Sequence, residues 1–413
     1  MNVRPAEPVS PIEAARQLCG RPGFVFLDSS LAGPESISLL ASDPSEVLEG
    51  RDWALLEKAV ASLSRSGPDL GYPNGAAIGH VAFDGSFRFG FYDQVFVYVH
   101  GDDRWITPPN FSNTLPRPPW SRIPFRPEIH EAEYIRMVER AREYIAAGDI
   151  YQVCLAHRFS APGRFDAWSF YESLRHFSPA PHAAFLNAGP IRIASASPEC
   201  FLRLSGRQIV TRPIKGTRPR CADPETDHRN ARELTTSQKE AAELVMITDL
   251  ERNDLGTVCE FGSVAVPDLL RLERFEQVFH LVSTVTGTLR PEISHVAALQ
   301  SCFPGGSISG APKKRALEII SELEPSQRGV YTGAIGYLGY NGESQFSIAI
   351  RTAVFESDIA HFHSGAGIVA DSIPQKEWHE TLAKASGLLR AAEPPVRILE
   401  ADSEPIQCDL PDV

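Results

Sequence analysis

The sequence of 413 residues has few cysteines, no long apolar run and no excess of positive charge. Its seven cysteines are scattered, odd in number and never spaced as CxxC, which argues against a disulfide framework or a zinc site. No stretch of 18 apolar residues occurs, so we expect no membrane-spanning helix. The formal net charge of −12 disfavours non-specific binding to nucleic acid or to an anionic membrane. The first residues lack the apolar core of a signal peptide, and we expect a cytoplasmic protein.

What is present is a mixture of strand and helix patterns typical of an α+β protein with largely antiparallel sheets. In residues 1–105 short apolar runs alternate with turn residues, and one helical pattern covers 53–63. Seven prolines between positions 108 and 127 indicate a connection, because neither a helix nor a central strand tolerates them. We therefore divide the chain into a divergent N-terminal part (1–125), a second region (126–395) and an acidic tail (396–413).

In the second region the patterns predict several helices and a series of β-rich runs. Asn341-Gly342 is a strong hairpin dipeptide between two of these runs. Ser237 and Glu240 predict a capping box at the start of one helix, and a charged loop is expected before it, at 218–228. The expected helices are 131–147, 167–176, 235–250 and 375–391. The expected β-rich runs are 150–159, 183–186, 191–195, 200–214, 275–289, 331–339, 345–355 and 359–366.

One predicted hairpin brings a carboxylate and an amine together. The runs Cys200–Leu204 and Gln208–Ile214 flank a turn that contains Gly206, which is a hairpin signal. Glu199 and Lys215 would then lie at the same open end, directly opposed or one diagonal step apart, about 5–8 Å. Such a pair could act on one bound molecule as acid and nucleophile, or form an ordinary cross-strand ion pair. Spacing alone favours the ion pair.

Two predicted helices carry the pattern Glu-x-x-Glu, as Glu240/Glu243 and Glu377/Glu380. Spacing of i, i+3 places both carboxylates of a pair on one helix face. Two such faces opposed across a pocket would form an oxygen-rich site suited to Mg²⁺. Alternatively, each pair belongs to a solvated helix face, with a lysine four residues away as its partner.

Two further features are suited to binding an anion. The loop from Gly305 to Gly310 has the outer glycines of a P-loop but lacks its lysine, and its N–H groups and the Ser307 hydroxyl could hold a carboxylate or simply form a tight turn. Arg351 lies among small residues of a predicted strand, where it could bind a carboxylate or form a structural ion pair. His280, in an apolar strand, is by itself more typical of a core histidine.

The order and spacing of these motifs resemble a known family. The region from about Ile145 to Leu388 resembles the chorismate-utilising enzymes, component I of anthranilate synthase and of aminodeoxychorismate synthase. The resemblance implies one sandwich of two antiparallel β-sheets, with helices outside and the site between the sheets. The matching segments are Gly148–Gln152, Ser195–Phe201, Pro213–Arg220, Lys239–Glu243, Met246–Gly256, Phe303–Lys313 and Gly365–Asp371, continuing to Glu380–Lys384.

The resemblance also implies a role for each matching residue. Lys215 would be the nucleophile that adds at C2 of chorismate, before ammonia enters at C4. Glu199 would be the general acid that protonates the departing C4 hydroxyl. Glu243 and Glu380 would hold Mg²⁺, with Glu240 and Glu377 in support. Contacts with substrate are implied for Gln152, Thr217, His280, Ser307, Tyr331, Arg351, Gly365, Ala366, Gly367 and Lys384.

The central residue of Pro-Ile-x-Gly-Thr distinguishes reactions within the family. Aminodeoxychorismate synthases carry Lys there and anthranilate synthases carry Ala, and this chain has Lys215. The isochorismate and salicylate synthases, which add water, place a lysine base where this chain has Gln152. We therefore expect 4-amino-4-deoxychorismate as product, for 4-aminobenzoate and folate biosynthesis. The alternatives are an anthranilate synthase component I and a silent, chorismate-binding homologue.

The motifs that are missing or altered bear on partners and regulation. No glutaminase motif is present, so ammonia would come from free ammonium or from a separate glutamine amidotransferase chain. No lyase domain is fused, so a separate aminodeoxychorismate lyase would act on the product. Ser307 and Leu244 stand where the family usually has Thr and His. Segments 26–30 and 178–182 depart from the family's tryptophan-binding pattern, and we make no prediction of tryptophan control.

Overall fold

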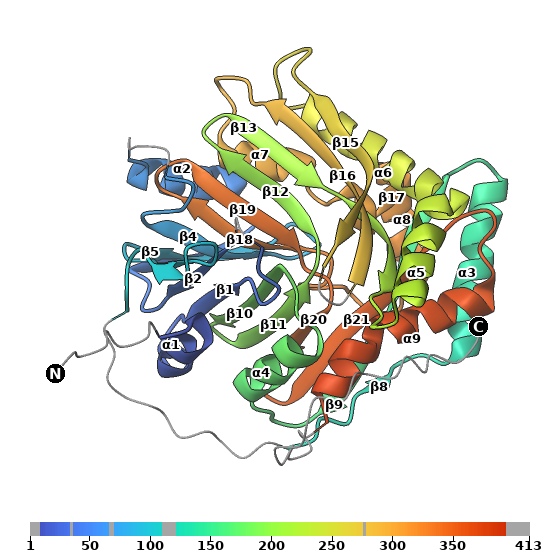
Figure 1. Cartoon of the computed structure of the whole chain (residues 1–413), viewed down its shortest axis with the longest axis horizontal. Helices are drawn as coiled ribbons and strands as arrows, with labels where there is room; N and C mark the ends of the chain where they lie inside the picture. Colours follow the sequence, from blue (N-terminus) through green and yellow to red (C-terminus); the bar gives the residue numbers. More distant parts are fainter. Residues whose placement is uncertain (1–8, 34–35, 66–69, 110–120, 276–277, 394–413) are drawn as a thin grey trace.

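The protein is a sandwich of two antiparallel β-sheets with helices on the outer faces (Figure 1). A computed structural model describes residues 9–33, 36–65, 70–109, 121–275 and 278–393. The architecture confirms the α+β sandwich expected from the sequence. Of the proline-rich connection at 108–127, residues 110–120 lie outside the described residues, and so does the acidic tail.

The first sheet has eleven strands, and one edge of it forms a wall of the candidate site. Its longest pairing joins β9 to β21 over ten residue pairs, from Ile359↔Pro162 to Ile368↔Val153. In spatial order its strands are β17 (Gly310–Ala311), β9 (Gln152–Pro162), β21 (Ile359–Ile368), β20 (Thr352–Phe355), β11 (Ile191–Ser197), β10 (His182–Ala188), β1 (Val25–Asp28), β2 (Ile37–Ala41), β6 (Phe96–Val99) and β7 (Arg104–Trp105), while β8 (Arg126–Pro127) pairs with β9.

The second sheet has ten strands and carries the segment around Lys215. Strand β16 is its longest, and β13 and β14 lie one after the other along the same edge of β16. The spatial order is β14 (Ile214–Pro219), β16 (Val278–Thr288), β13 (Gln208–Arg212), β12 (Cys200–Ser205), β19 (Glu343–Ile348), β18 (Ala334–Gly339), β4 (Ala76–Val81), β5 (Phe87–Tyr92) and β3 (Glu46–Gly50), while β15 (Ala265–Arg274) pairs with β16.

Most of the helices cover the outer faces because they bury an apolar stripe against a sheet. The core between the sheets is separate and combines residues of β1, β2 and β10 with residues of β4 and β18. Helices α1, α4 and α9 pack on the first sheet, and α2, α6 and α7 pack on the second. The helices are α1 (Pro11–Leu18), α2 (Trp53–Leu63), α3 (Glu131–Ala146), α4 (Ala167–Phe177), α5 (Pro224–Thr236), α6 (Gln238–Gly256), α7 (His295–Cys302), α8 (Lys313–Leu323) and α9 (Pro374–Ala391).

Strands from the N-terminal part take part in both sheets. Strands β1, β2, β6 and β7 belong to the first sheet, while β3, β4 and β5 belong to the second. The part before residue 125 is therefore continuous in hydrogen bonding with the rest of the sandwich. Among the described residues, none of the helices is both long and apolar enough to span a membrane.

Two expectations about local structure are wrong. The run 345–355 is not one strand, because β19 ends in the second sheet and β20 begins in the first. The residues between them carry the chain from one sheet to the other, and Arg351 has φ of +50° there. The expected loop at 218–228 is instead the end of β14 followed by the start of α5, whose first turn is capped by the Asp223 side chain at the N–H of Thr226.

Candidate active site

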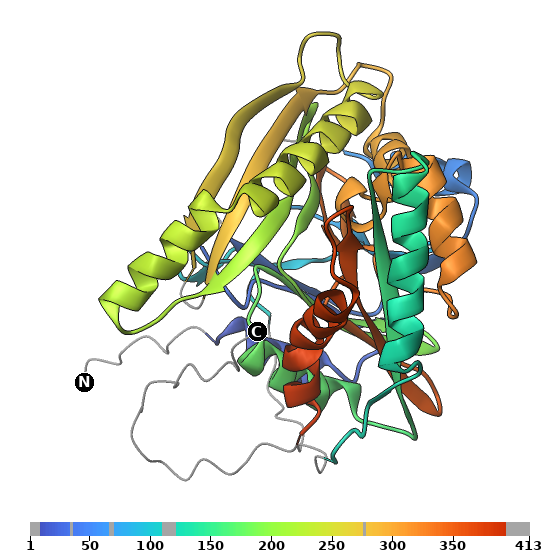
Figure 2. The same cartoon turned by 90° about the vertical axis from the view of Figure 1, so that its right-hand side faces the viewer.

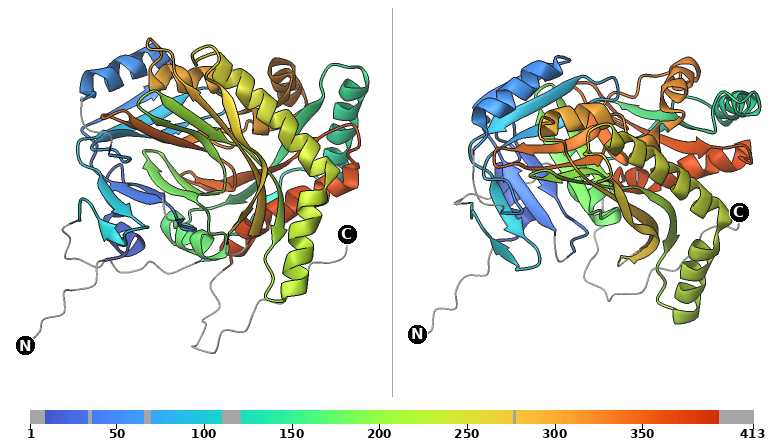
Figure 3. Two further views of the ribbon diagram at one scale, coloured as in Figure 1. Left: turned by 45° about the horizontal axis from the view of Figure 1, so that its top comes forward. Right: turned by 90° about the horizontal axis from the view of Figure 1, so that it is seen from above.

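The main candidate site is a cavity of about 500 Å³ between the ends of the two sheets. It is bounded by β9 and β21 of the first sheet, by β14 and β16 of the second, and by α6 and α9. Figure 2 shows α6 lying along β15 and β16, while α9 lies beside α3. Figure 3 shows α5 and α6 running end to end along one side of the second sheet, joined at Ser237.

The cavity brings together nearly all of the residues singled out from the sequence. Only Glu377 and Gln152, of those residues, do not line it. Gln152 nevertheless lies close behind the wall, since a Cβ added at Gly367 would be 3.2 Å from Gln152 Nε2 and 3.4 Å from Lys215 Nζ. The residues that line it are Lys215, Glu199, Glu240, Glu243, Glu380, Thr217, His280, Ser307, Tyr331, Arg351, Gly365, Ala366, Gly367 and Lys384.

Lys215 reaches the cavity by a different route from the expected hairpin. Strands β12 and β13 do form a hairpin, but β13 ends at Arg212. Lys215 lies on the next strand, β14, and pairs with Leu281 of β16. The expectation that one hairpin strand carries Lys215 is therefore wrong, because Pro213 cannot donate to a strand ladder and separates β13 from β14. Glu199 and Lys215 still lie at the same end, since each acts on the pKa of the other.

The backbone conformation at position 216 explains why a glycine follows Lys215. The register of β14 against β16 shifts between Lys215 and Thr217, which leaves Gly216 as the extra residue of a bulge with φ of +71°. A Cβ at this position would lie 2.4 Å from Leu234 Cδ1. The bulge thus turns the strand at the cavity wall, and only glycine has both the conformation and the space for it.

We expect Gly216→Ala to destabilise the protein by about 1–3 kcal/mol, because it places a side chain in a left-handed conformation against Leu234. The activity should fall as well, because Lys215 is the adjacent residue. Urea unfolding measures the stability, and Gly206→Ala is a matched control, since Gly206 also has positive φ but has open space around its Cβ position. Equal losses in the two variants would show that the Leu234 contact is unimportant.

The ammonium group of Lys215 forms an ion pair with a carboxylate on the cavity wall. Its Nζ lies 3.5 Å from Glu243 Oε2, and its side chain is 17 % exposed. Burial lowers the pKa of Lys215, but the neighbouring groups outweigh burial and the net direction is upward. The groups that raise this pKa are Cys154, Glu243, Glu380 and Glu199. Lys215 is therefore a cation before substrate enters.

Glu199 is a buried carboxyl group at the junction of β11 and β12. Burial raises the pKa of Glu199 to about 7, while Ser307 and Lys215 partly oppose the rise. Near neutral pH the group is thus partly protonated, as a general acid requires. Ser307 Oγ is itself buried and has no hydrogen-bonding partner of good geometry among the described residues.

The carboxylates of α6 and α9 lie close enough to change one another's pKa. Burial and then Glu243 raise the pKa of Glu240, and burial together with Glu380 raises that of Glu377. Glu380 has its pKa lowered, because Lys384, with Nζ 2.6 Å from Glu380 Oε1, outweighs its burial. Within the described ranges no group of three His, Cys, Asp or Glu side chains has the arrangement of a preformed metal site.

Another part of the cavity wall carries positive charge for an anion. Arg351 is half-buried, and the loss of water contact lowers its pKa. Its guanidinium forms no ion pair within the part of the chain that the structure describes. His280 lies close to Arg351, and burial with this neighbour lowers the pKa of His280 to about 4, so the imidazole is neutral. His280 Nδ1 is 3.0 Å from Thr217 Oγ1. An unpaired, half-buried guanidinium favours an incoming carboxylate.

Several lining residues were missed in the sequence. His363 stacks on Tyr331 with ring centroids 5.3 Å apart. It lies two residues before Gly365 on β21, so strand alternation was a usable signal for it. Arg328 is almost fully buried, pairs with Glu324 at 2.7 Å and donates to the Ile308 carbonyl. It follows a helix in a polar loop, where no pattern indicated burial.

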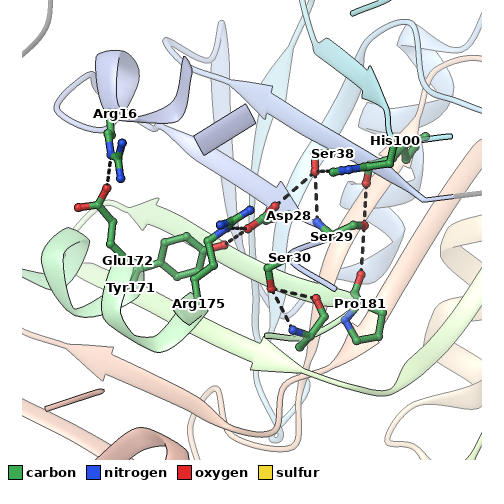
Figure 4. A network of polar contacts seen from close by, with 12 residues as sticks. Arg16, Asp28, Ser29, Ser30, Ser38, His100, Tyr171, Glu172, Arg175 and Pro181 are labelled. Carbon is green, nitrogen blue, oxygen red and sulfur yellow. Dashed lines mark hydrogen bonds and ion pairs between the residues drawn. The ribbon is translucent and has the colours of Figure 1, made fainter. Parts of the chain in front are cut away.

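A separate polar network joins segments 26–30 and 178–182 (Figure 4). Asp28 accepts hydrogen bonds from Tyr171 at 3.0 Å and from Arg175 at 2.6 Å. Ser30 Oγ donates to the Ala180 carbonyl at 3.1 Å and accepts from the Ala180 N–H at 2.9 Å. The adjoining cavity is only about 40 Å³, room for a few water molecules, so the chain's own side chains fill this place.

The chain belongs to the chorismate binding enzyme family, whose description matches residues 85–390, and the two-sheet fold with its cavity agrees with that assignment. Anthranilate synthase component 1 of Thermus thermophilus is 47 % identical over 272 residues, which are 66 % of this chain and 59 % of that protein. Anthranilate synthase component 1 of Streptomyces coelicolor is 50 % identical over 264 residues, 64 % of this chain and 52 % of that protein. The matched parts thus span little more than half the length of these curated relatives.

A solved structure supports the same assignment. The crystal structure of anthranilate synthase component I from Streptococcus pneumoniae superposes with a TM-score of 0.76 at 31 % identity, covering 87 % of this chain and 93 % of that chain. The similarity therefore extends over both sheets. The motif residues that carry the family resemblance line the cavity described above.

Proposed function

We propose that the chain is an aminodeoxychorismate synthase component I, which converts chorismate and ammonia to 4-amino-4-deoxychorismate and water. The observation that carries this proposal is the position of Lys215 Nζ inside the cavity, where Gly367 on the facing sheet leaves room for it. The family resemblance associates a lysine at this point of Pro-Ile-x-Gly-Thr with amination at C4. Ammonia would come from a separate glutamine amidotransferase chain, and a separate lyase would act on the product.

The proposed chemistry assigns one proton and one bond to each group. Neutral Lys215 attacks C2 of the ring, the double bonds shift, and the C4 hydroxyl leaves as water with the proton of Glu199. Ammonia then attacks C4, and the C2–nitrogen bond to Lys215 breaks. Glu199 recovers its proton from the entering ammonia. Because its neighbours raise the pKa of Lys215, it must lose a proton before it attacks, and Glu243, whose Oε2 lies 3.5 Å from Lys215 Nζ, would receive it.

Mg²⁺ is included in the proposal because the residues present fit it. Carboxylate oxygens are its preferred protein ligands, and it often needs only one or two of them alongside substrate oxygens. Glu240, Glu243 and Glu380 line the same cavity, and burial together with Glu243 raises the pKa of Glu240, a repulsion that a bound cation would relieve. Glu243 and Glu380 would hold the ion, with Glu240 and Glu377 in support. When bound, Mg²⁺ would supply positive charge for a substrate carboxylate.

Removal of Mg²⁺ with a chelator should abolish chorismate conversion, and added Mg²⁺ should restore it. We expect Glu243→Gln to weaken Mg²⁺ binding by at least roughly 10–100-fold, because it removes a ligand charge. Calorimetric titration of Mg²⁺ into the protein, with and without chorismate, measures this independently of turnover. Glu233→Gln on the exposed side of α5 is the matched control. Unchanged Mg²⁺ affinity in Glu243→Gln would contradict the assignment.

A second candidate function is anthranilate synthase component I, which forms anthranilate and pyruvate from chorismate. The curated relatives named above carry that name at 47 % and 50 % identity, and they favour this candidate over the first. The same cavity, acid and carboxylates would serve both reactions. The two candidates differ in the part played by Lys215.

Product identification separates the candidates. The protein is incubated with chorismate, Mg²⁺ and ammonium, with and without added aminodeoxychorismate lyase. We expect 4-aminobenzoate only when the lyase is present. Fluorescent anthranilate with pyruvate release and no lyase would replace the first candidate with the second. Chorismate binding without turnover in either arm would identify a silent homologue.

A further inference from the structure

Glu251 is a buried carboxyl group for which the reaction described above has no use. It lies on α6, two turns beyond Glu243, and is 2 % exposed. Its side chain points into the protein beside the 3₁₀ turn Gly306–Ile308, which belongs to the loop from Gly305 to Gly310 that carries Ser307. We call this segment the Ser307 loop.

Glu251 joins three elements that meet near Glu199. Its Oε1 accepts the N–H of Gly306 at 3.2 Å, and its Oε2 is 3.4 Å from the Thr211 hydroxyl on β13. Gly306 packs so closely that an added Cβ would lie 3.1 Å from Leu250 Cβ and 3.3 Å from Glu251 Oε1. The Glu251 side chain thus connects three elements: helix α6, which also carries Glu243, strand β13 of the hairpin, and the Ser307 loop.

Other groups form hydrogen bonds with the far side of the Ser307 loop. Cys154 of β9 donates its N–H to the Ser309 carbonyl at 2.8 Å, and Arg328 donates to the Ile308 carbonyl at 3.0 Å. Glu251 holds the opposite side of the loop. Loss of Glu251 would therefore free one side of the loop while the other side stays attached.

We propose that Glu251 is a positioning residue, which acts on Glu199 by holding Ser307 against it. The inference rests on the proposed role of Glu199 as the acid. Ser307 opposes the rise of the Glu199 pKa, so movement of the loop changes the strength of that acid. Glu251 suits this place because a buried hydrogen-bonded carboxyl group is costly to leave unpaired and thus restrains its partners.

Glu251 is largely neutral when it does this. Burial raises its pKa to about 8, Asp254 and Glu199 raise it further, and Lys313 opposes them. These groups come from α6, the β11–β12 junction and α8, and the buried Cys302 thiol of α7 also faces it. One carboxyl oxygen accepts the Gly306 N–H, while the other accepts the Thr211 hydroxyl or, when it carries the proton, donates to it. Glutamine has the same ability.

The test uses the full-length protein and three variants. Glu251→Ala loses both hydrogen bonds, and we expect kcat to fall about tenfold with KM within about twofold. Glu251→Gln keeps both and should stay within about threefold of the wild type. Thr248→Val is the matched control, since Thr248 is equally buried on α6 but bonds only to the Leu244 carbonyl of its own helix.

A double-mutant cycle shows whether Glu251 acts through Ser307. Ser307→Ala alone should lower kcat, and adding Glu251→Ala should then cost less than about twofold. Infrared titration should show the pKa of Glu199 moving upward in both single variants, because the opposing hydroxyl is displaced or lost. Full additivity of the two kcat losses, or an unchanged Glu199 titration in Glu251→Ala, would overturn the proposal.

Hydrogen exchange of the Ser307 loop provides a result that does not depend on turnover. Protection of the Gly306 amide should fall in Glu251→Ala and persist in Glu251→Gln. If the wild type converts no chorismate, the proposed function fails, while this loss of protection still supports the positioning role. Unchanged protection in Glu251→Ala overturns it. If Glu251→Ala does not fold, Glu251→Gln alone decides the test. A folded Glu251→Gln protein that loses protection of the Gly306 amide, or whose kcat falls more than about tenfold, overturns the positioning role.

Discussion

Lys215→Ala should abolish amination at C4, with a loss of at least about a thousandfold in rate. The alanine has no nitrogen to add at C2, so the covalent route through Lys215 is closed. The fold should survive, because the Lys215 side chain lines a cavity and is no part of the hydrophobic core. Quantifying 4-aminobenzoate after addition of the lyase measures the loss.

The matched control is Lys239→Ala. Lys239 lines the same cavity and its Nζ lies 3.9 Å from Glu243 Oε1, so this variant removes the same charge near the same carboxylate. We expect it to keep activity within about fivefold. In the wild type without ammonia, intact-protein mass spectrometry should detect an adduct equal to chorismate less one water, absent from Lys215→Ala. Unchanged amination in Lys215→Ala would refute the covalent role.

The sequence predicted best those elements whose signals are local. The helix expected at 53–63 is α2, and the helix expected at 375–391 is α9 with one further residue. Both have an amphipathic period and a clear start. The motifs also predicted most of the residues that line the cavity, because the strands and helices that carry them meet at one end of the sandwich.

The local route of the chain around Lys215 depends on pairing that no local pattern contains. In the sequence, Pro213 and Gly216 are typical of the end of one hairpin strand. In the structure, Pro213 marks a break between β13 and β14, and Gly216 forms a bulge within β14. Only the length of β16 shows that β13 and β14 follow each other along it. Arg351 is a similar case, since its positive φ occurs where the chain crosses between sheets.

Helix α5 and Glu251 were missed for want of apolar periodicity. Leu234 is the only buried residue that α5 contributes among its described positions, so hydrophobic spacing could not reveal it. Asp223 before Pro224 was a usable start signal. Glu251 lies in the mostly polar segment Asp249–Asp254, where the sequence pattern predicts that a charged side chain is exposed. Its burial comes from the Ser307 loop, which lies more than 50 residues away along the chain.

Glu199→Gln should lower kcat by about 10²–10⁴-fold, because glutamine cannot supply a proton to the departing C4 hydroxyl. Chorismate affinity should stay within about threefold, since the two side chains have nearly the same shape. In the wild type the carboxyl C=O band of Glu199 should disappear as pH rises through about 7. The direction follows from its raised pKa, which keeps the group protonated above the range of an exposed carboxyl.

Glu251 must be separated from Glu199 in this titration, because burial raises the pKa of Glu251 to about 8. Glu251→Gln removes that contribution, so a band that remains in Glu251→Gln and vanishes in Glu199→Gln belongs to Glu199. Because the two carboxyl groups interact, the wild-type curve should be broader than a single titration. A Glu199→Gln protein that keeps full kcat would show that the proton comes from another group. A band absent at every pH would show that Glu199 is ionised in the cavity and unable to act as the acid.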